Sequence, residues 1–124
     1  MRKLSKLRID TRIVNLFYSA IIQSALSFSI TCWYGSCSIE AKGKLTRIIR
    51  NCVKLGVENS SNLADIYKKS SLHRCEVITS DPSHPLNSSY QLLPSGKRLR
   101  SMNCRTSRYC KSFVPDSIRA LNKR

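Results

Sequence analysis

The feature that most constrains the fold is a run of uncharged residues from Ile13 to Ile39, IVNLFYSAIIQSALSFSITCWYGSCSI. It extends over 27 positions without a single Asp, Glu, Lys or Arg. Asp10 is placed to cap a helix and Gly35 to end one, which predicts a single helix over residues 11–34, about 36 Å long. Apolar side chains fall on every side of this helix, so we expect other groups to surround it.

Either a bilayer or protein would supply those surroundings. The run is long enough to cross a bilayer, but Asn15, Gln23 and several serines interrupt it, so its mean hydropathy is only moderate for a membrane helix. A secretory signal is disfavoured because the apolar region is too long and no small-x-small cleavage site follows it. We therefore expect a helix buried in protein, with membrane insertion as the alternative. A chain of 124 residues offers few elements to surround such a helix, which suggests a piece of a larger protein.

Two amphipathic helices are predicted next. The first covers about residues 39–55, with Ser38 as its cap, Gly56 at its end, and one buried stripe formed by Leu45, Ile48, Ile49, Cys52 and Val53. The second covers about residues 61–79 and starts after Ser60 or Ser61. Its apolar side is predicted to hold Leu63, Ile66, Tyr67, Val77 and Ile78.

Two prolines, Pro82 and Pro85, then prevent helix formation, and residues 81–114 are predicted to form an extended basic loop. The stretch VPDSIRALN predicts a short terminal helix with Pro115 near its first position. The predicted fold class is thus all-α, a small helical bundle. We expect a helical domain over residues 1–80, and a basic loop with a terminal helix over residues 81–124 that packs on the first part or trails from it.

The charge of the chain is strongly unbalanced, with a formal value of +15 at pH 7. Residues 97–124 hold nine Lys or Arg against one acid, Asp116, which is a net +8. Unpaired cations repel one another, and an anionic partner relieves this repulsion. Nucleic acid and an acidic membrane surface are the natural partners, and of these we expect an RNA or DNA backbone. A solvated, disordered basic tail is the alternative.

The predicted nucleic-acid contacts come from two places. One is the basic stripe opposite the apolar side of the 39–55 helix, and the other is the basic loop. Tyr109 and Phe113 are candidates to stack on an unpaired base, or else belong to the core. The predicted phosphate-binding residues are Arg47, Arg50, Lys54, Lys97, Arg98, Arg100, Arg105, Arg108 and Lys111.

Catalytic and metal chemistry are not predicted. The six cysteines lack the short paired spacings of a zinc site, and two of them lie in helical patterns, so we expect reduced thiols in an intracellular protein, in cytoplasm and nucleus, that is not secreted. His73 and His84 are the two imidazoles, and the seven acids are scattered singly. We therefore expect no catalytic residue, no metal and no cofactor.

Four stretches carry a family resemblance: LFYSAIIQSALSFSITCWYGS, RIIRNCVKLGV, DPSHPLNSSYQLLPSGKRLR and CRTSRYCKSFVPDSIRALN. In this order they resemble the region C-terminal to the palm and thumb (post-thumb) of reverse transcriptases from non-LTR, LINE-type retrotransposons. The resemblance implies an RNA-directed DNA polymerase as the parent, with catalytic aspartates in a Tyr-Ala-Asp-Asp type motif. This chain has no such motif, so the resemblance implies a non-catalytic, nucleic-acid-binding fragment that contacts the remaining thumb and palm.

The same stretch is also similar to the N-terminal region described for the AlkB homologue eight family, whose members repair alkylated nucleic acid or modify tRNA. That similarity would imply methyltransferase or iron/2-oxoglutarate dioxygenase activity, for which the chain lacks the residues. A segment that only packs on its parent and binds no ligand of its own is the remaining alternative.

Overall fold

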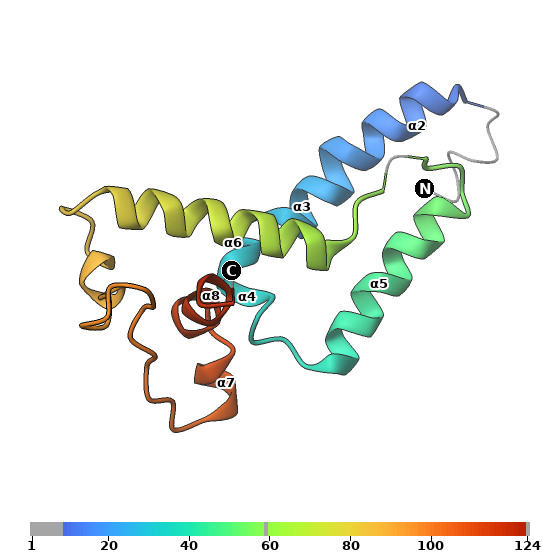
Figure 1. Cartoon of the computed structure of the whole chain (residues 1–124). Helices are drawn as coiled ribbons and strands as arrows, with labels where there is room; N and C mark the ends of the chain where they lie inside the picture. The colour runs from blue at the N-terminus through green and yellow to red at the C-terminus, as the bar shows by residue number, and fades with distance from the viewer. Residues whose placement is uncertain (1–8, 59, 124) are drawn as a thin grey trace. The chain divides into compact units, whose positions relative to one another are not determined.

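The structure, a computed structural model, describes residues 9–58 and 60–123. Its helices are α2 (Thr11–Phe17), the π-helix η1 (Tyr18–Gln23), α3 (Ser24–Ser27), α4 (Ile30–Trp33), α5 (Ile39–Val53), α6 (Leu63–Ser80), the 3₁₀ turn η2 (Asn87–Ser89), α7 (Ser107–Cys110) and α8 (Phe113–Leu121), most of which are labelled in Figure 1. Over the described residues, β pairing is limited to one isolated antiparallel bridge between Leu92 and Leu99. The prediction of an all-α protein is confirmed.

The chain divides into two compact units. Unit 1 contains the described residues up to Ile30 together with Cys37–Ile66, and unit 2 contains Thr31–Ser36 together with the described part of Tyr67–Arg124. These units differ from the predicted division at residue 80, because α6 contributes its first turn to unit 1 and the rest of its length to unit 2.

The prediction of one continuous helix over residues 11–34 is wrong. The α-helix passes into a π-helical segment at Tyr18 and stops after Ser27, where Phe28 is extended with ψ 122° and Ser29 has φ +46°. Serine hydroxyls in this segment donate to carbonyls one turn earlier, Ser19 to Leu16 at 3.0 Å and Ser27 to Ser24 at 3.3 Å. Such bonds compete with the regular helical ladder and favour bends. None of the helices in the described part of the chain has both the length and the apolar character that crossing a membrane requires.

The expectation that this segment is buried all round is also wrong. Val14 and Tyr18 lie in the core of unit 1, but Leu16 is 68% exposed and Phe28 is 76% exposed. The core consists of Val14, Tyr18, Cys52 and Val57, with Ile9 and Ile22 packed against it. It is too small to cover the other faces of the segment.

Helix α5 begins and ends close to its predicted bounds. Ser38 caps it, since its Oγ accepts a hydrogen bond from the Ala41 amide at 3.1 Å. Gly56 follows the end of the helix with φ +97°, a conformation that favours glycine. The predicted apolar stripe is only partly buried: Cys52 lies in the core, whereas Ile48 and Val53 are each almost half exposed, because the small core of unit 1 offers them no partner.

Helix α6 begins at Leu63, two residues after the predicted start at residue 61. Asn62 provides the cap, because its side chain accepts a hydrogen bond from the Ala64 amide at 3.2 Å and its carbonyl accepts one from the Ile66 amide at 3.1 Å. The expected apolar line needs one correction, since Val77 is half exposed and Cys75 takes the buried position beside Ile78. Cysteine behaves as a small hydrophobic residue in such a site.

Residues 81–114 are not one extended loop. The segment contains η2, a hydrogen-bonded turn around Gly96, and α7, and α8 already starts at Phe113. The turns form because Asp81 Oδ1 accepts bonds from the amide and hydroxyl of Ser83, at 2.9 and 2.6 Å, and His84 Nδ1 accepts one from the Leu86 amide at 3.1 Å. These short-range side-chain bonds give the proline-containing stretch a defined path.

Unit 2 is held by a second core, in which helix α8 contributes Ile118. Cys75, Ile78, Tyr90 and Ile118 are buried there, and Leu99, Phe113, Val114 and Leu121 pack against them. Pro115 lies in the third position of α8, within the first turn, where a missing amide hydrogen costs little. The Tyr90 hydroxyl hydrogen-bonds with Ser117 Oγ at 2.9 Å, so these two buried hydroxyls are each other's partner.

Candidate nucleic-acid interface

Three predicted cations lie in unit 1, near the C-terminal end of α5. Arg47 and Arg50 are one helical turn apart on α5, and Lys54 is its C-terminal capping residue. All three are exposed. This confirms that the side of α5 opposite Cys52 is basic and faces solvent, and cations at this end of a helix also interact favourably with its dipole.

Three more, Lys97, Arg98 and Arg100, lie on a hydrogen-bonded turn in unit 2. The Leu93 amide donates to the Arg98 carbonyl at 2.8 Å, and the Arg100 amide donates to the Gln91 carbonyl at 2.7 Å. Gly96 closes the turn with φ +68°. The turn therefore presents the three exposed cations on a paired backbone, where sequence patterns had predicted an extended one.

Asn122 attaches this turn to the end of α8. Its Oδ1 accepts a hydrogen bond from the Leu99 amide at 2.8 Å, and its Nδ2 donates to the Leu99 carbonyl at 3.0 Å. Leu99 itself packs against the core of unit 2. The backbone of Leu99 is thus bonded to Asn122 and its side chain packs on the core. These two attachments limit the motion of the neighbouring cations.

The last three predicted cations surround the short helix α7. Thr106 caps α7, since its Oγ1 accepts a hydrogen bond from the Tyr109 amide at 3.2 Å. Arg105 precedes this cap, Arg108 lies within the helix, and Lys111 follows its last residue; all three are exposed. The helix turns the chain so that these side chains extend from a folded segment.

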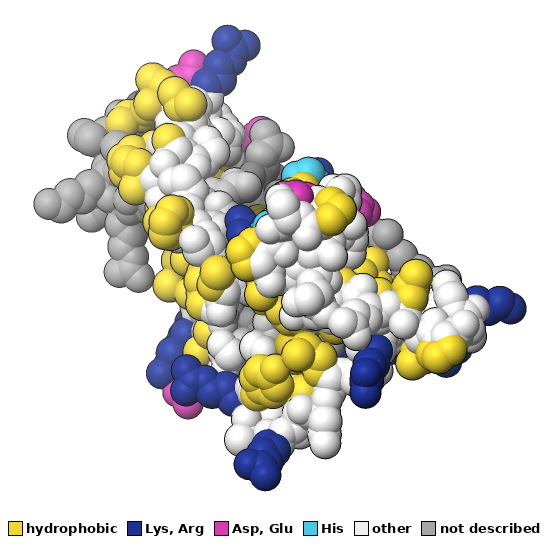
Figure 2. All heavy atoms as spheres, turned by 90° about the vertical axis from the view of Figure 1, so that its left-hand side faces the viewer, with side chains coloured by type: hydrophobic (Ala, Val, Ile, Leu, Met, Phe, Trp, Pro, Cys, Tyr) yellow, Lys and Arg dark blue, Asp and Glu magenta, His cyan; other side chains and the backbone are white. Residues whose placement is uncertain are grey.

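The nine predicted cations share an absence of carboxylate partners. Within residues 9–58 and 60–123 the ion pairs are Lys44 with Glu40, 2.7 Å, and Arg119 with Asp116, 3.3 Å, and neither includes a predicted residue. Figure 2 shows Lys and Arg side chains, in dark blue, projecting into solvent on the face in view. Three of the nine cations belong to unit 1 and six belong to unit 2. Only the six in unit 2 are therefore placed in one folded unit.

The structure separates the two aromatic candidates. Tyr109 is 44% exposed on α7, between Arg108 and the basic residue Lys111. Phe113 packs against the core of unit 2 and serves its stability. Tyr109 is therefore the side chain free to stack on a base.

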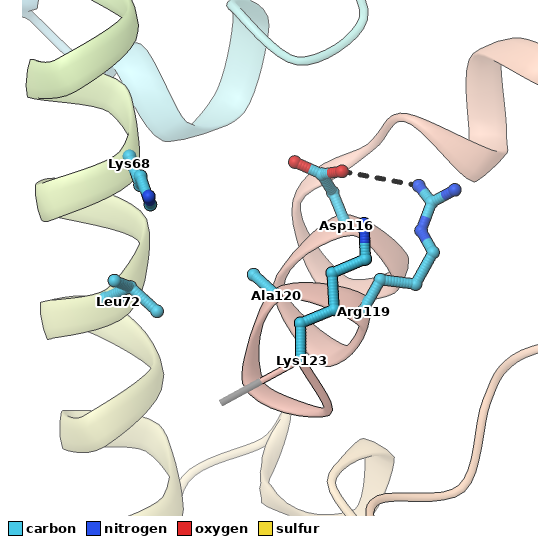
Figure 3. A pocket seen from close by; sticks show the side chains of 6 residues that line it. All are labelled: Lys68, Leu72, Asp116, Arg119, Ala120 and Lys123. Carbon is cyan, nitrogen blue, oxygen red and sulfur yellow. Dashed lines mark hydrogen bonds and ion pairs between the residues drawn. The ribbon is translucent and has the colours of Figure 1, made fainter.

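A further group of cations lines a hollow in unit 2 that sequence analysis missed. The hollow, about 520 Å³, lies between α6 and α8, and in the close-up Leu72 and Ala120 point toward each other across it (Figure 3). Lys68 lies on its α6 side, and Arg119 and Lys123 on its α8 side. These residues carry no motif, and only the packing of α6 on α8 brings them together.

Asp116 supplies the negative charge in this hollow. Its Oδ1 pairs with Arg119, and its Oδ2 accepts a hydrogen bond from the Tyr67 hydroxyl at 2.9 Å. Burial, followed by that bond, raises the pKa of Tyr67 well above its ordinary value, so Tyr67 remains a neutral donor. Three cations, Lys68, Arg119 and Lys123, line the hollow with this one carboxylate, so its net charge is +2 and it suits an anion.

The structure gives no group of three His, Cys, Asp or Glu side chains, among the residues it describes, that could hold a metal ion. The six cysteines are free thiols, with Cys52 and Cys75 buried and Cys32 exposed. His84 has a structural role, in which its Nδ1 accepts the Leu86 amide hydrogen in the turn after α6.

Comparisons with known proteins leave the family open. No family model matches the chain, and neither the curated proteins nor the solved structures give a match.

Proposed function

We propose that this chain is a nucleic-acid-binding segment that contacts the phosphate backbone of RNA or DNA. The observation that carries this proposal is that all nine predicted cations are exposed and none is paired with a carboxylate of the described residues. The six in unit 2 are presented on a hydrogen-bonded turn and on a capped helix. A folded display of this kind loses less conformational freedom on binding than a disordered tail does.

The resemblance of the sequence to the post-thumb region of non-LTR reverse transcriptases supports a more specific version of the proposal. In this version the chain is a non-catalytic piece of an RNA-directed DNA polymerase, acts inside the cell, and holds template or target while the parent's palm carries the paired aspartates. The proposal does not extend to AlkB-type chemistry, since no metal-ligand set is found in the described residues.

The salt dependence of binding tests the proposal. Affinity for a labelled DNA duplex, measured by fluorescence anisotropy, should fall linearly on a log–log plot between about 50 and 200 mM salt, with a slope of about −0.9 for each phosphate neutralised. Replacing Lys97, Arg98 and Arg100 with Gln should make that slope shallower by about 2 to 3. A salt-independent affinity, or no binding at the lowest salt, contradicts the proposal.

A control variant that loses the same charge elsewhere tests whether binding depends on the position of the cations or only on the net charge. Arg12, Lys69 and Arg74 are exposed cations on α2 and α6, outside the predicted set. Replacing them with Gln removes three charges and should change the slope by less than 1. An equal effect of both triple variants would show that only the net charge matters.

A second function, packing against the rest of a larger protein, is favoured by one observation in unit 1. Large apolar side chains there remain uncovered: Leu16, Phe28 and Ile39 are 68%, 76% and 87% exposed. Figure 2 also shows hydrophobic side chains, in yellow, at the surface. Charge reversal at Arg98, Arg100 and Arg105 distinguishes the two functions, because a purely packing role predicts unchanged RNA retention.

A further inference from the structure

Cys104 and Cys110 form a pair of thiols inside the basic segment. Cys104 follows the turn that carries Lys97 to Arg100, and Cys110 is the last residue of α7. Both side chains line the same small hollow in unit 2, together with Arg119. Both are half-buried, so a small reagent can reach the pair from solvent.

The surroundings hold the two sulfurs in place. The Cys104 thiol donates to the Met102 carbonyl at 3.4 Å, and the Arg119 guanidinium lies 3.6 Å from the Cys110 sulfur and also donates to the Cys110 carbonyl. A guanidinium beside a sulfur stabilises negative charge on it. Arg119 thus anchors the end of α7 to α8 and places positive charge at the thiol pair.

We propose that Cys104 and Cys110 are a modification site, at which a low-molecular-weight disulfide such as glutathione disulfide converts the two thiols into a reversible disulfide. The Cys110 thiolate attacks one sulfur of the reagent, so an S–S bond forms to the protein and the first glutathione leaves as a thiolate. Cys104 then loses its proton and attacks the Cys110 sulfur of this mixed disulfide. The second glutathione leaves, and the two protons released by the protein are taken up by the two leaving thiolates.

Formation of the disulfide between Cys104 and Cys110 would change the proposed nucleic-acid interface. It makes a ring over residues 104–110 that contains Arg105 and Arg108, and it fixes the segment in which both lie. On the basis of the proposed nucleic-acid function, the oxidised form should bind a DNA duplex about fivefold more tightly, because less freedom remains to be lost on binding.

Peptide mapping of the full chain tests the site directly. After equilibration in buffers of reduced and oxidised glutathione, acid quenching and trypsin digestion, cleavage after Arg100, Arg105, Arg108 and Lys111 yields the fragments 101–105 and 109–111. We expect mass spectrometry to find these fragments joined under oxidising conditions and separate again after reduction. Separate fragments in the most oxidising buffer, with each cysteine free or individually glutathionylated, would overturn the proposal.

Matched variants separate the chemistry from the binding. Cys104→Ser and Cys110→Ser should each abolish the joined fragments, whereas Cys32→Ser and Cys37→Ser, which alter the other accessible thiols, should leave them unchanged. A redox-dependent affinity seen in the wild type and lost in Cys104→Ser supports the effect on binding, and equal affinities of the two forms overturn it. If the disulfide forms but neither form binds duplex, the nucleic-acid function fails while the modification site stands.

Discussion

The two units of the chain are built differently although both are helical. Unit 2 combines an apolar core with side-chain hydrogen bonds between residues far apart in the sequence, such as Tyr67 with Asp116 and Asn122 with Leu99. Unit 1 has the smaller core and leaves large apolar side chains exposed, and its described residues show one bond of this kind, from the Glu58 amide to Asn15. The contrast indicates that unit 2 is the part better supported by contacts within the described chain.

The largest expected effect comes from Gly35, which lies in unit 2. A Cβ placed there would collide with the backbone carbonyl of Lys111 and the Tyr67 hydroxyl. We expect Gly35→Ala to lower the free energy of unfolding by about 1–3 kcal/mol, as overpacking does. Urea unfolding followed by the fluorescence of Trp33 measures this, since Trp33 belongs to unit 2.

Gly43 provides the matched control for this substitution. It lies within α5, and a Cβ there would meet nothing within 4 Å. Gly43→Ala should stabilise the helix by about 0.5–1 kcal/mol. Equal unfolding midpoints for Gly35→Ala and the wild type would refute the close packing of Gly35.

The next prediction compares a buried and an exposed apolar side chain of unit 1. Val14 is buried in its core, so Val14→Ala should lower the local stability of α2 by about 1.5 kcal/mol. Phe28→Ala removes a larger side chain that is 76% exposed, and we expect a change of less than about 0.5 kcal/mol. Hydrogen exchange of peptides from α2 measures both, and a larger loss for Phe28→Ala would contradict the exposed placement.

The buried polar contact of unit 2 predicts a smaller effect. Tyr90→Phe removes the hydroxyl that lies 2.9 Å from Ser117 Oγ and 3.6 Å from Cys75 Sγ, and should cost about 1 kcal/mol of unfolding free energy. Burial raises the pKa of Tyr90, so this hydroxyl stays protonated at neutral pH. The exposed Tyr109→Phe is the control, and a similar cost for both would argue against a special role for the buried bond.

The smallest expected effect is the pH dependence from Asp81. Hydrogen bonds from the Ser83 side chain and amide lower the pKa of Asp81 below the ordinary 3.8. A lowered folded-state pKa adds stability that is fully present above 3.8 and is lost as the pH falls through the folded-state value. Asp81→Asn should make the acid limb of unfolding midpoint against pH slightly shallower. A steeper limb would contradict this assignment.

Local signals in the sequence predicted part of this architecture well. Ser38 and Gly56 define the ends of α5 because capping and positive φ depend on neighbouring residues only. The interruption at Phe28 and Ser29 was not predictable from apolar content, since it depends on competing serine bonds within the helix. The choice of Asn62 over Ser60 or Ser61 as the cap of α6 likewise depended on which side chain reaches the free amides.

The candidate site shows the same division. Charge and helical periodicity in the sequence predict that the nine cations are exposed. They do not predict the folded turn and helix that position these cations. The bond of Asn122 to Leu99 joins residues 23 positions apart, and the hollow lined by Lys68 and Lys123 needs α6 and α8 to pack together. Long-range packing of this kind leaves no local pattern in the sequence.

The paired amide bonds of Asn122 also set how far the chain can be shortened without loss of an attachment. Because a single side chain holds the backbone of Leu99, ending the chain before residue 122 would detach the 91–100 turn from α8, while the amide bonds within the turn remain.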